Sequence, residues 1–234
     1  MRPVTTVPSG GWLVLLIGGH SGAGKSTLAA QIARRTGASH VEADDVRVAI
    51  QRVTTPDQLP ALHFFTSAPG VARPGIWQCD PQELVQGLIG VGKVVSRALG
   101  PVVGHHVAAA KPVVLEGDGI LPALAAPDSD GWSPPHGLHR AIAAGAVRSV
   151  FLVESDLEVV RQQMGTGPEG AAQAVMHWQY GQWLRAEAQR HGESVLPPRP
   201  YGTLLQRVLA LVGAPRVSDS IPVLPPRQTA IGRS

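Results

Sequence analysis

Short apolar runs alternate along the chain with longer segments of helical spacing. Three runs of strand length cover residues 12–17, 112–116 and 147–153, and two shorter candidates cover 39–43 and 195–196. Strands that are apolar on both faces belong inside a parallel sheet, and strands that alternate with helices pair in parallel through right-handed crossovers. The pattern therefore predicts an α/β fold, a three-layer sandwich around a parallel five-stranded sheet.

Helix signals separate these strands. The Asp80-Pro81 pair is a typical helix start, and Ser155 with Glu158 forms the pattern of a capping box. The expected helices span 28–35 with a stop at Gly37, 46–51, 81–99 with a second one over 101–110, 155–164, 171–191 and 203–212. Residues 54–79 have no clear period and are expected to form an irregular excursion over the sheet edge, of the kind that shapes a binding pocket.

The 234 residues suggest one domain, 1–212, followed by a Pro-rich tail, 213–234. Net charge is only +3 and no run of Lys or Arg occurs, so nothing indicates nucleic-acid binding. Cys79 is the only cysteine, which excludes an internal disulfide. The first apolar run is too short to cross a membrane and lacks the features of a secretion signal. We expect a cytoplasmic protein without a membrane partner; the sequence is silent on oligomeric state.

A glycine-rich loop follows the first strand. Gly19-x-x-x-x-Gly24-Lys25-Ser26 matches the phosphate loop in full, between a buried strand and a helix. The glycines let backbone N–H groups point inward around phosphates, and the helix start adds partial positive charge. Lys25, one of only three lysines, would reach the outer phosphates, and the hydroxyl of Ser26 would bind Mg²⁺.

A phosphate loop occurs in motors, switch GTPases and kinases. A GTPase normally carries Asn-Lys-x-Asp for guanine, and this chain contains no asparagine. A motor of the AAA type would end an apolar strand in Asp-Glu, whereas the strand at 113–116 ends in Glu-Gly. Both departures disfavour those two classes.

Acidic residues follow two of the predicted strands on the ligand edge of the sheet. Asp44 could take the proton of an acceptor hydroxyl or hold Mg²⁺ through water, although Asp44 or its neighbour Asp45 could instead cap the next helix. Arg47, one helical turn on, could bind an anionic acceptor or lie on the surface. After the third strand, Glu116 could bind hydroxyls of the acceptor or a metal-bound water, and Asp118 could do either or simply shape the turn.

Arg161 precedes the Gly165-Thr-Gly-Pro168 segment, which has the composition of a hinge. A lid that closes there could bring Arg161 to the transferring phosphoryl group. The alternative is a solvated helix face.

These motifs together resemble a known family. The glycine loop at 18–27, Asp44-x-x-Arg47, and Val114-Leu-Glu-Gly-Asp-Gly-Ile-Leu-Pro122 look like the P-loop small-molecule kinases, and most like 2-phosphoglycerate kinase and its bacterial relatives. Chloramphenicol phosphotransferase-like kinases share the architecture more distantly. Two departures from the family pattern are Asp118, where the family usually has Val or His, and a lid with few arginines.

The resemblance implies a P-loop fold that uses ATP and Mg²⁺, with Asp44 facing the acceptor and Arg47 contacting it. It implies that the nucleotide is bound by Gly19, His20, Ser21, Gly22, Ala23, Gly24, Lys25, Ser26 and Thr27. The predicted activity is transfer of the γ-phosphoryl group to a hydroxyl of a small metabolite that can be anionic. Two alternatives stay open: an antibiotic-modifying phosphotransferase, and a nucleotide-binding regulatory protein without kinase activity.

Overall fold

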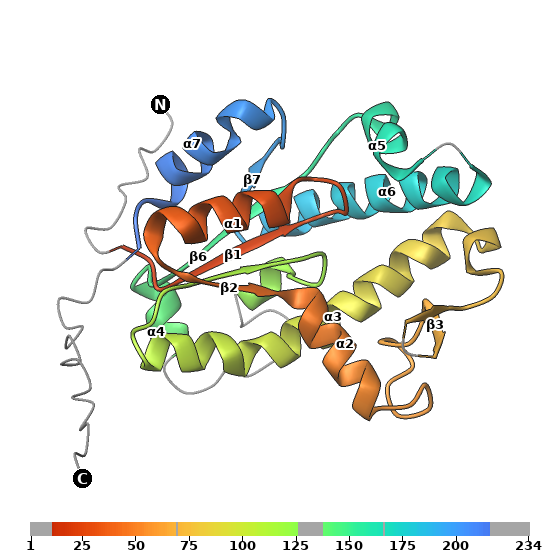
Figure 1. Cartoon of the computed structure of the whole chain (residues 1–234), viewed down its shortest axis with the longest axis horizontal. Coiled ribbons are helices and arrows are strands. Elements are labelled where there is room, and N and C mark those ends of the chain that lie inside the picture. Colours follow the sequence, from red (N-terminus) through yellow and green to blue (C-terminus); the bar gives the residue numbers. More distant parts are fainter. Residues whose placement is uncertain (1–10, 69, 126–137, 166, 216–234) are drawn as a thin grey trace, which may run out of the picture.

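The computed structural model describes residues 11–68, 70–125, 138–165 and 167–215 (Figure 1). Its main sheet has the strand order β2-β5-β1-β6-β7, and all neighbouring strands are parallel. The strands are β1 (Val14–Gly19), β2 (Ser39–Glu42), β5 (Val113–Glu116), β6 (Val147–Leu152) and β7 (Ser194–Leu196). The predicted five-stranded parallel sheet is confirmed.

Helices cover both faces of this sheet. Alternate side chains of β1 enter different cores: Val14 and Leu16 pack with α3 (Pro81–Ala108) and α6 (Pro168–Arg190), whereas Leu15 and Ile17 pack with α1 (Lys25–Thr36) and α7 (Tyr201–Val212). Figure 1 shows α1 and α7 on one side of the sheet and α3 on the other. The predicted three-layer sandwich is confirmed, because a strand buried on both faces requires a helical layer on each.

The remaining elements connect the main strands and helices. They are α2 (Ala43–Val53), a hairpin of β3 (Thr66–Ala68) and β4 (Val71–Ala72), a 3₁₀ turn at Ile76–Gln78, a second at Pro122–Leu124, α4 (Leu138–Ala143) and α5 (Leu157–Met164). The segment 54–79, expected to be wholly irregular, thus contains a small antiparallel hairpin. Helix α4 was not predicted.

Several helices begin a few residues before their expected starts, and two further boundaries are wrong for reasons of packing and capping. The helix expected to stop near Leu99 continues through Pro101 as one helix, α3. Pro101 is exposed while Leu99 and Val103 are buried, so the packing of the helix on both sides of the proline outweighs the loss of one backbone hydrogen bond. At the start of α5 the cap is Asp156 rather than Ser155, since the Asp156 carboxylate accepts from the backbone N–H of Glu158.

The two ends of the described chain meet beside β1. The Trp12 indole donates to the carbonyl of Gly213 at 3.0 Å, and Trp12 pairs with Pro215 as an isolated parallel bridge. The predicted tail begins at residue 213, and its residues 216–234 lie outside the described ones.

Helix α3 is long and apolar enough, by length and composition, to cross a membrane. Half of the apolar window is buried inside the structure, in contact with the sheet and with α6. Its apolar character is therefore that of a helix in the protein core.

Gly87 of α3 lies under the ring of Phe64. A Cβ at this position would stand 2.2 Å from two ring carbons, whereas a Cβ at Gly90, one turn on, would make ordinary contact with Ala61 at 3.5 Å. We expect Gly87→Ala to lower the free energy of unfolding by about 1–2 kcal/mol through overpacking, while Gly90→Ala leaves it unchanged or raises it. Urea denaturation of both variants measures the difference; equal effects would contradict the packing of Phe64 on α3.

Candidate active site

The loop between β1 and α1 owes its shape to three glycines in the positive-φ region. Gly19, Gly22 and Gly24 have φ values of 145°, 79° and 81°. A Cβ at Gly19 would lie 2.4 Å from the carbonyl oxygen of Leu152, so this position also excludes a side chain on steric grounds. Helix α1 begins at Lys25 without a side-chain cap, which leaves backbone N–H groups at its start for an anion.

Lys25 lies under this loop and is nearly inaccessible to solvent. Its ammonium donates to the carbonyl of His20 at 2.9 Å and forms an ion pair with Asp118 at 2.6 Å. Burial opposes the ionisation of Asp118, but the charge of the neighbouring Lys25 outweighs it and holds the pKa of this carboxyl below its usual range. The pair joins the start of α1 to the turn after β5.

His20 ties the loop to the strand on its other side. The ring is fully buried: its Nε2 accepts from the backbone N–H of Glu154 at 3.1 Å, and Nδ1 donates to the carbonyl of Ser21 at 2.7 Å. Burial lowers the pKa of His20, which favours the neutral ring with the proton on Nδ1. The loop is thereby held in place before any ligand binds.

Glu154 anchors the start of α5. Although burial opposes its ionisation, hydrogen bonds from the N–H groups of Asp156 and Ser155 and from Arg199 keep the pKa of Glu154 below its usual range. Glu154 and Arg199 lie 45 positions apart in the chain. Neither has a local signal, because their contact joins residues far apart in the chain.

Carboxylates gather beside Ser26 where β2 and β5 end. Glu42 and Glu116 are register partners, and ligand atoms of His40, Glu42 and Glu116 lie within 4.8 Å of one another. Burial raises the pKa of Glu116, opposed by a hydrogen bond from Ser26. A serine hydroxyl among carboxylates is a donor set that suits Mg²⁺, so these residues could hold that ion.

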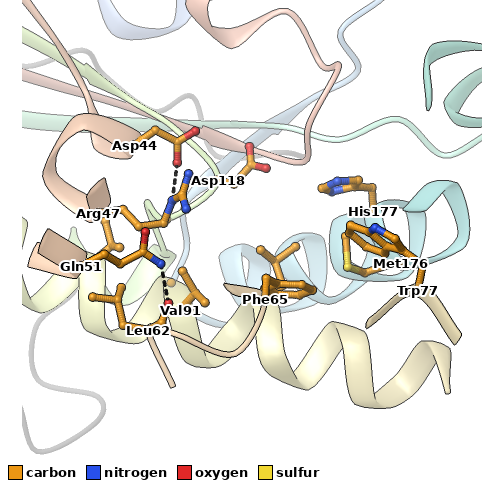
Figure 2. Close-up of a pocket in the computed structure, with 14 residues that line it drawn as sticks. Asp44, Arg47, Gln51, Leu62, Phe65, Trp77, Val91, Asp118, Met176 and His177 are labelled. Atoms are coloured by element: carbon orange, nitrogen blue, oxygen red, sulfur yellow. Dashed lines mark hydrogen bonds and ion pairs between the residues drawn. The ribbon is translucent and has the colours of Figure 1, made fainter. Parts of the chain in front are cut away.

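Two cavities meet at the carboxyl edge of the sheet. One, of about 310 Å³, is lined by the phosphate loop, Thr27 and Glu116; the other, of about 190 Å³, lies among α2, α3 and α6. Asp44 and Asp118 line both. Asp44 accepts from the Nε of Arg47 at 3.0 Å, as Figure 2 shows. Glu42 is the cap residue of α2 and makes no side-chain cap bond, so neither Asp44 nor Asp45 caps that helix.

His177 of α6 faces this second cavity beside Asp118 (Figure 2). Burial lowers its pKa from 6.5 to about 4, despite the nearby Asp118 carboxylate. Tyr180, one turn on, donates its hydroxyl proton to the carbonyl of Asp118. The ring of His177 is therefore neutral at pH 7.

This burial predicts an acid-sensitive contribution to stability. The pKa of His177 is lower in the folded protein than in the unfolded chain. Its contribution to the free energy of unfolding is therefore fully present above about pH 6.5 and is lost as the pH falls toward 4. Between pH 7 and pH 5 we expect His177 to account for a loss of about 2 kcal/mol in the free energy of unfolding. His177→Gln should flatten this pH dependence, whereas the same change at the exposed His105 should not; urea denaturation at both pH values decides it.

Arg161 lines neither of the two cavities. On α5 it pairs with Glu158 at 3.7 Å, and half of its side chain is exposed. Two other residues of α5 face the phosphate loop instead: a Cβ on Gly22 would meet Gln163 and Met164, and Gln163 donates to the hydroxyl of Tyr201 at 3.0 Å. Sequence reasoning missed Gln163, Tyr201 and His177, because uncharged or solitary side chains on a helix carry no signal of what they face.

Comparison with known proteins agrees with this arrangement. Residues 14–74, less than half of the chain, match a family described as an AAA domain. A 2-phosphoglycerate kinase of Pyrococcus horikoshii is 27% identical over 113 residues, which cover 48% of this chain and 37% of that protein. One of Pyrococcus furiosus is 40% identical over 55 residues, covering 23% and 18%. The chain resembles P-loop kinases.

The matched segments span little more than a third of the first of these relatives and less of the second. Among solved structures, a sugar kinase from Janibacter sp. HTCC2649 has a TM-score of 0.44 and 19% identity, covering 85% of this chain and 93% of that one. The predicted resemblance to the P-loop small-molecule kinases is confirmed by the sequence relatives.

Proposed function

We propose that this protein is an ATP- and Mg²⁺-dependent kinase that phosphorylates a hydroxyl of a small molecule. The observation that carries the proposal is the pair of adjoining cavities, one lined by the phosphate loop and one suited to an acceptor, which share Asp44 and Asp118. Phosphoryl transfer needs donor and acceptor in line across a short gap, and two adjoining sites provide that placement. Similarity to two 2-phosphoglycerate kinases supports the same reaction class.

The loop residues from Gly19 to Thr27 would bind the phosphates of ATP through backbone N–H groups, with Lys25 moving from Asp118 to the β and γ phosphates. Ser26 would hold Mg²⁺, with Glu42 and Glu116 beside it. Bound there, Mg²⁺ would neutralise charge on the outer phosphates.

On the acceptor side, Asp44 would orient the hydroxyl and take its proton. The hydroxyl oxygen then forms a bond to the γ phosphorus while the bond to the β-phosphate oxygen breaks, and ADP leaves with that electron pair. Arg47 would fix the Asp44 carboxylate and contact the acceptor, and Glu116 and Asp118 would border the site. Movement of α5 would bring Arg161 to the transferring group.

Acceptor dependence tests the proposal. With ATP and Mg²⁺, ADP release should rise in a saturable way with one class of small alcohol and stop when EDTA removes the metal. A regulatory nucleotide-binding protein would instead hydrolyse ATP slowly and at a rate that no acceptor changes, which would contradict the kinase assignment.

A further inference from the structure

The acceptor cavity points to one chemical class of substrate. We propose that the acceptor is an uncharged alcohol with an apolar body about the size of one ring, and not a phosphorylated or multiply carboxylated metabolite. This inference rests on the proposed kinase function and specifies the substrate of the same site.

The walls of the cavity are mostly apolar. They include Leu62, Phe65, Trp77, Leu88, Val91 and Met176. The rings of Phe65 and Trp77 are stacked at an angle of 30°, with centroids 6.0 Å apart, and Figure 2 shows both at the cavity beside α3. Such walls gain free energy by removing a hydrocarbon surface from water, and they offer a charged group nothing in return for its hydration.

The volume of the cavity limits the size of the apolar body. It measures about 190 Å³, and an apolar cavity of about 150 Å³ is known to bind benzene. One ring with a short side chain that carries the hydroxyl therefore fits between the aromatic walls and Asp44.

Charge disfavours an anionic acceptor. Among the described residues that line the cavity, Arg47 is the one cation, and it is paired with Asp44 at 3.0 Å. Asp118, the other carboxylate there, is paired with Lys25. A dianion such as a phosphate ester would lie beside the carboxylates of Asp44 and Asp118, and the one nearby cation, Arg47, is already paired with Asp44. The net electrostatic interaction of the cavity with such a dianion is therefore repulsive.

The polar end of the cavity suits a single hydroxyl. His177 is 91% buried, since its exposed fraction is 9%, and its Nδ1 has no hydrogen-bond partner among the described residues. Figure 2 shows its ring on the side of the cavity where Asp118 lies, with Asp44 beyond Asp118, and Asp118 also lines the phosphate-loop cavity. A neutral imidazole provides a hydrogen bond for an alcohol group, without the positive charge that a phosphate or carboxylate requires.

An acceptor competition measures this preference. The protein is incubated with ATP, Mg²⁺ and one acceptor at a time, and ADP release is measured together with the phosphate monoester product, which is detected by ³¹P NMR. The apolar acceptors are 2-phenylethanol and cyclohexylmethanol, and the anionic ones are 2-phosphoglycerate and glycerate. We expect kcat/KM for at least one apolar alcohol to exceed that for either anion by tenfold or more. Preference for an anion, or no ester from either apolar alcohol while ATP still binds, would overturn the inference.

These outcomes separate the inference from the proposed function. A higher kcat/KM for 2-phosphoglycerate than for the apolar alcohols would contradict the apolar class and leave the kinase assignment standing. If calorimetry detects no binding of ATP to the wild-type protein, the kinase assignment itself is contradicted.

A pair of leucine variants tests the cavity directly. Leu88 lines it, whereas Leu211 is an exposed residue of α7, and α7 packs on the other face of the sheet. Leu88→Gln keeps the side-chain size but places an amide in the apolar wall, so kcat/KM for the preferred apolar alcohol should fall at least tenfold. Leu211→Gln should have no effect. Equal activity of the two variants, with both still binding ATP, would show that the acceptor does not occupy this cavity.

Discussion

Replacing Lys25 with alanine is expected to abolish phosphoryl transfer. Its ammonium lies beneath the phosphate loop and is the positive group beside Asp118, where the γ-phosphoryl group would pass between the two cavities. Removing a single charge-stabilising donor from a site of this kind lowers turnover on the order of 10³-fold. Initial rates with ATP, Mg²⁺ and the best acceptor measure the loss, and wild-type turnover would contradict the role of Lys25.

The same substitution leaves the Asp118 carboxylate without its partner. Breaking one side of a buried ion pair destabilises a protein by roughly 3 kcal/mol, so Lys25→Ala alone could lose activity because it unfolds. The double variant Lys25→Ala/Asp118→Ala removes both charges and should recover most of that stability in urea denaturation. Its turnover should stay as low as that of Lys25→Ala, which separates the role of the ammonium in transfer from its role in stability.

Features with local physical causes could be predicted from the sequence. The buried run of β1, the glycines of the loop and the stop of α1 at Gly37 each depend on residues close in the chain. Gly37 adopts φ 71°, as a helix end of this type requires. The parallel sheet also follows from a local pattern, since strands buried on both faces alternate with helices.

Features that depend on contacts across the chain could not be predicted. The partnership of Lys25 with Asp118 and that of Glu154 with Arg199 each join different crossover units. Proline chemistry alone predicts that the helix ends near Pro101, and only the packing of α3 in the core explains why the helix continues. The apolar acceptor cavity depends on which faces of α3 and α6 come together, and no spacing of residues encodes that.

The two acidic residues at the end of β5, Glu116 and Asp118, illustrate the same limit. Glu116 and Asp118 follow each other closely at the end of one strand, and the sequence predicts the same possible partners for both, an acceptor or a metal-bound water. In the structure Glu116 lines the phosphate-loop cavity beside Ser26, and Asp118 lines both that cavity and the second one. A difference of two residues after a strand thus decides whether a side chain also reaches the second cavity, and Gly117, with φ 151°, forms the turn between them.

Replacing Asp44 with asparagine is expected to lower turnover by 10² to 10⁴-fold while ATP binding stays within twofold of the wild type. Asparagine has the same shape but cannot accept the hydroxyl proton. The fold should not change, because 62% of the Asp44 side chain is exposed and an exposed i, i+3 pair with Arg47 contributes little to stability. Single-turnover rates and calorimetry with ATP measure the two effects separately.

Asp45→Asn is the matched control. Asp45 is the next residue in the first turn of α2 and, like Asp44, is exposed to solvent, but it lines neither cavity. It removes the same charge from the same helix start and should keep wild-type turnover. If Asp45→Asn instead loses activity and Asp44→Asn does not, the proton acceptor is misassigned. If both lose it equally, the effect comes from the net charge at the start of α2 and not from a carboxylate at the junction of the two cavities.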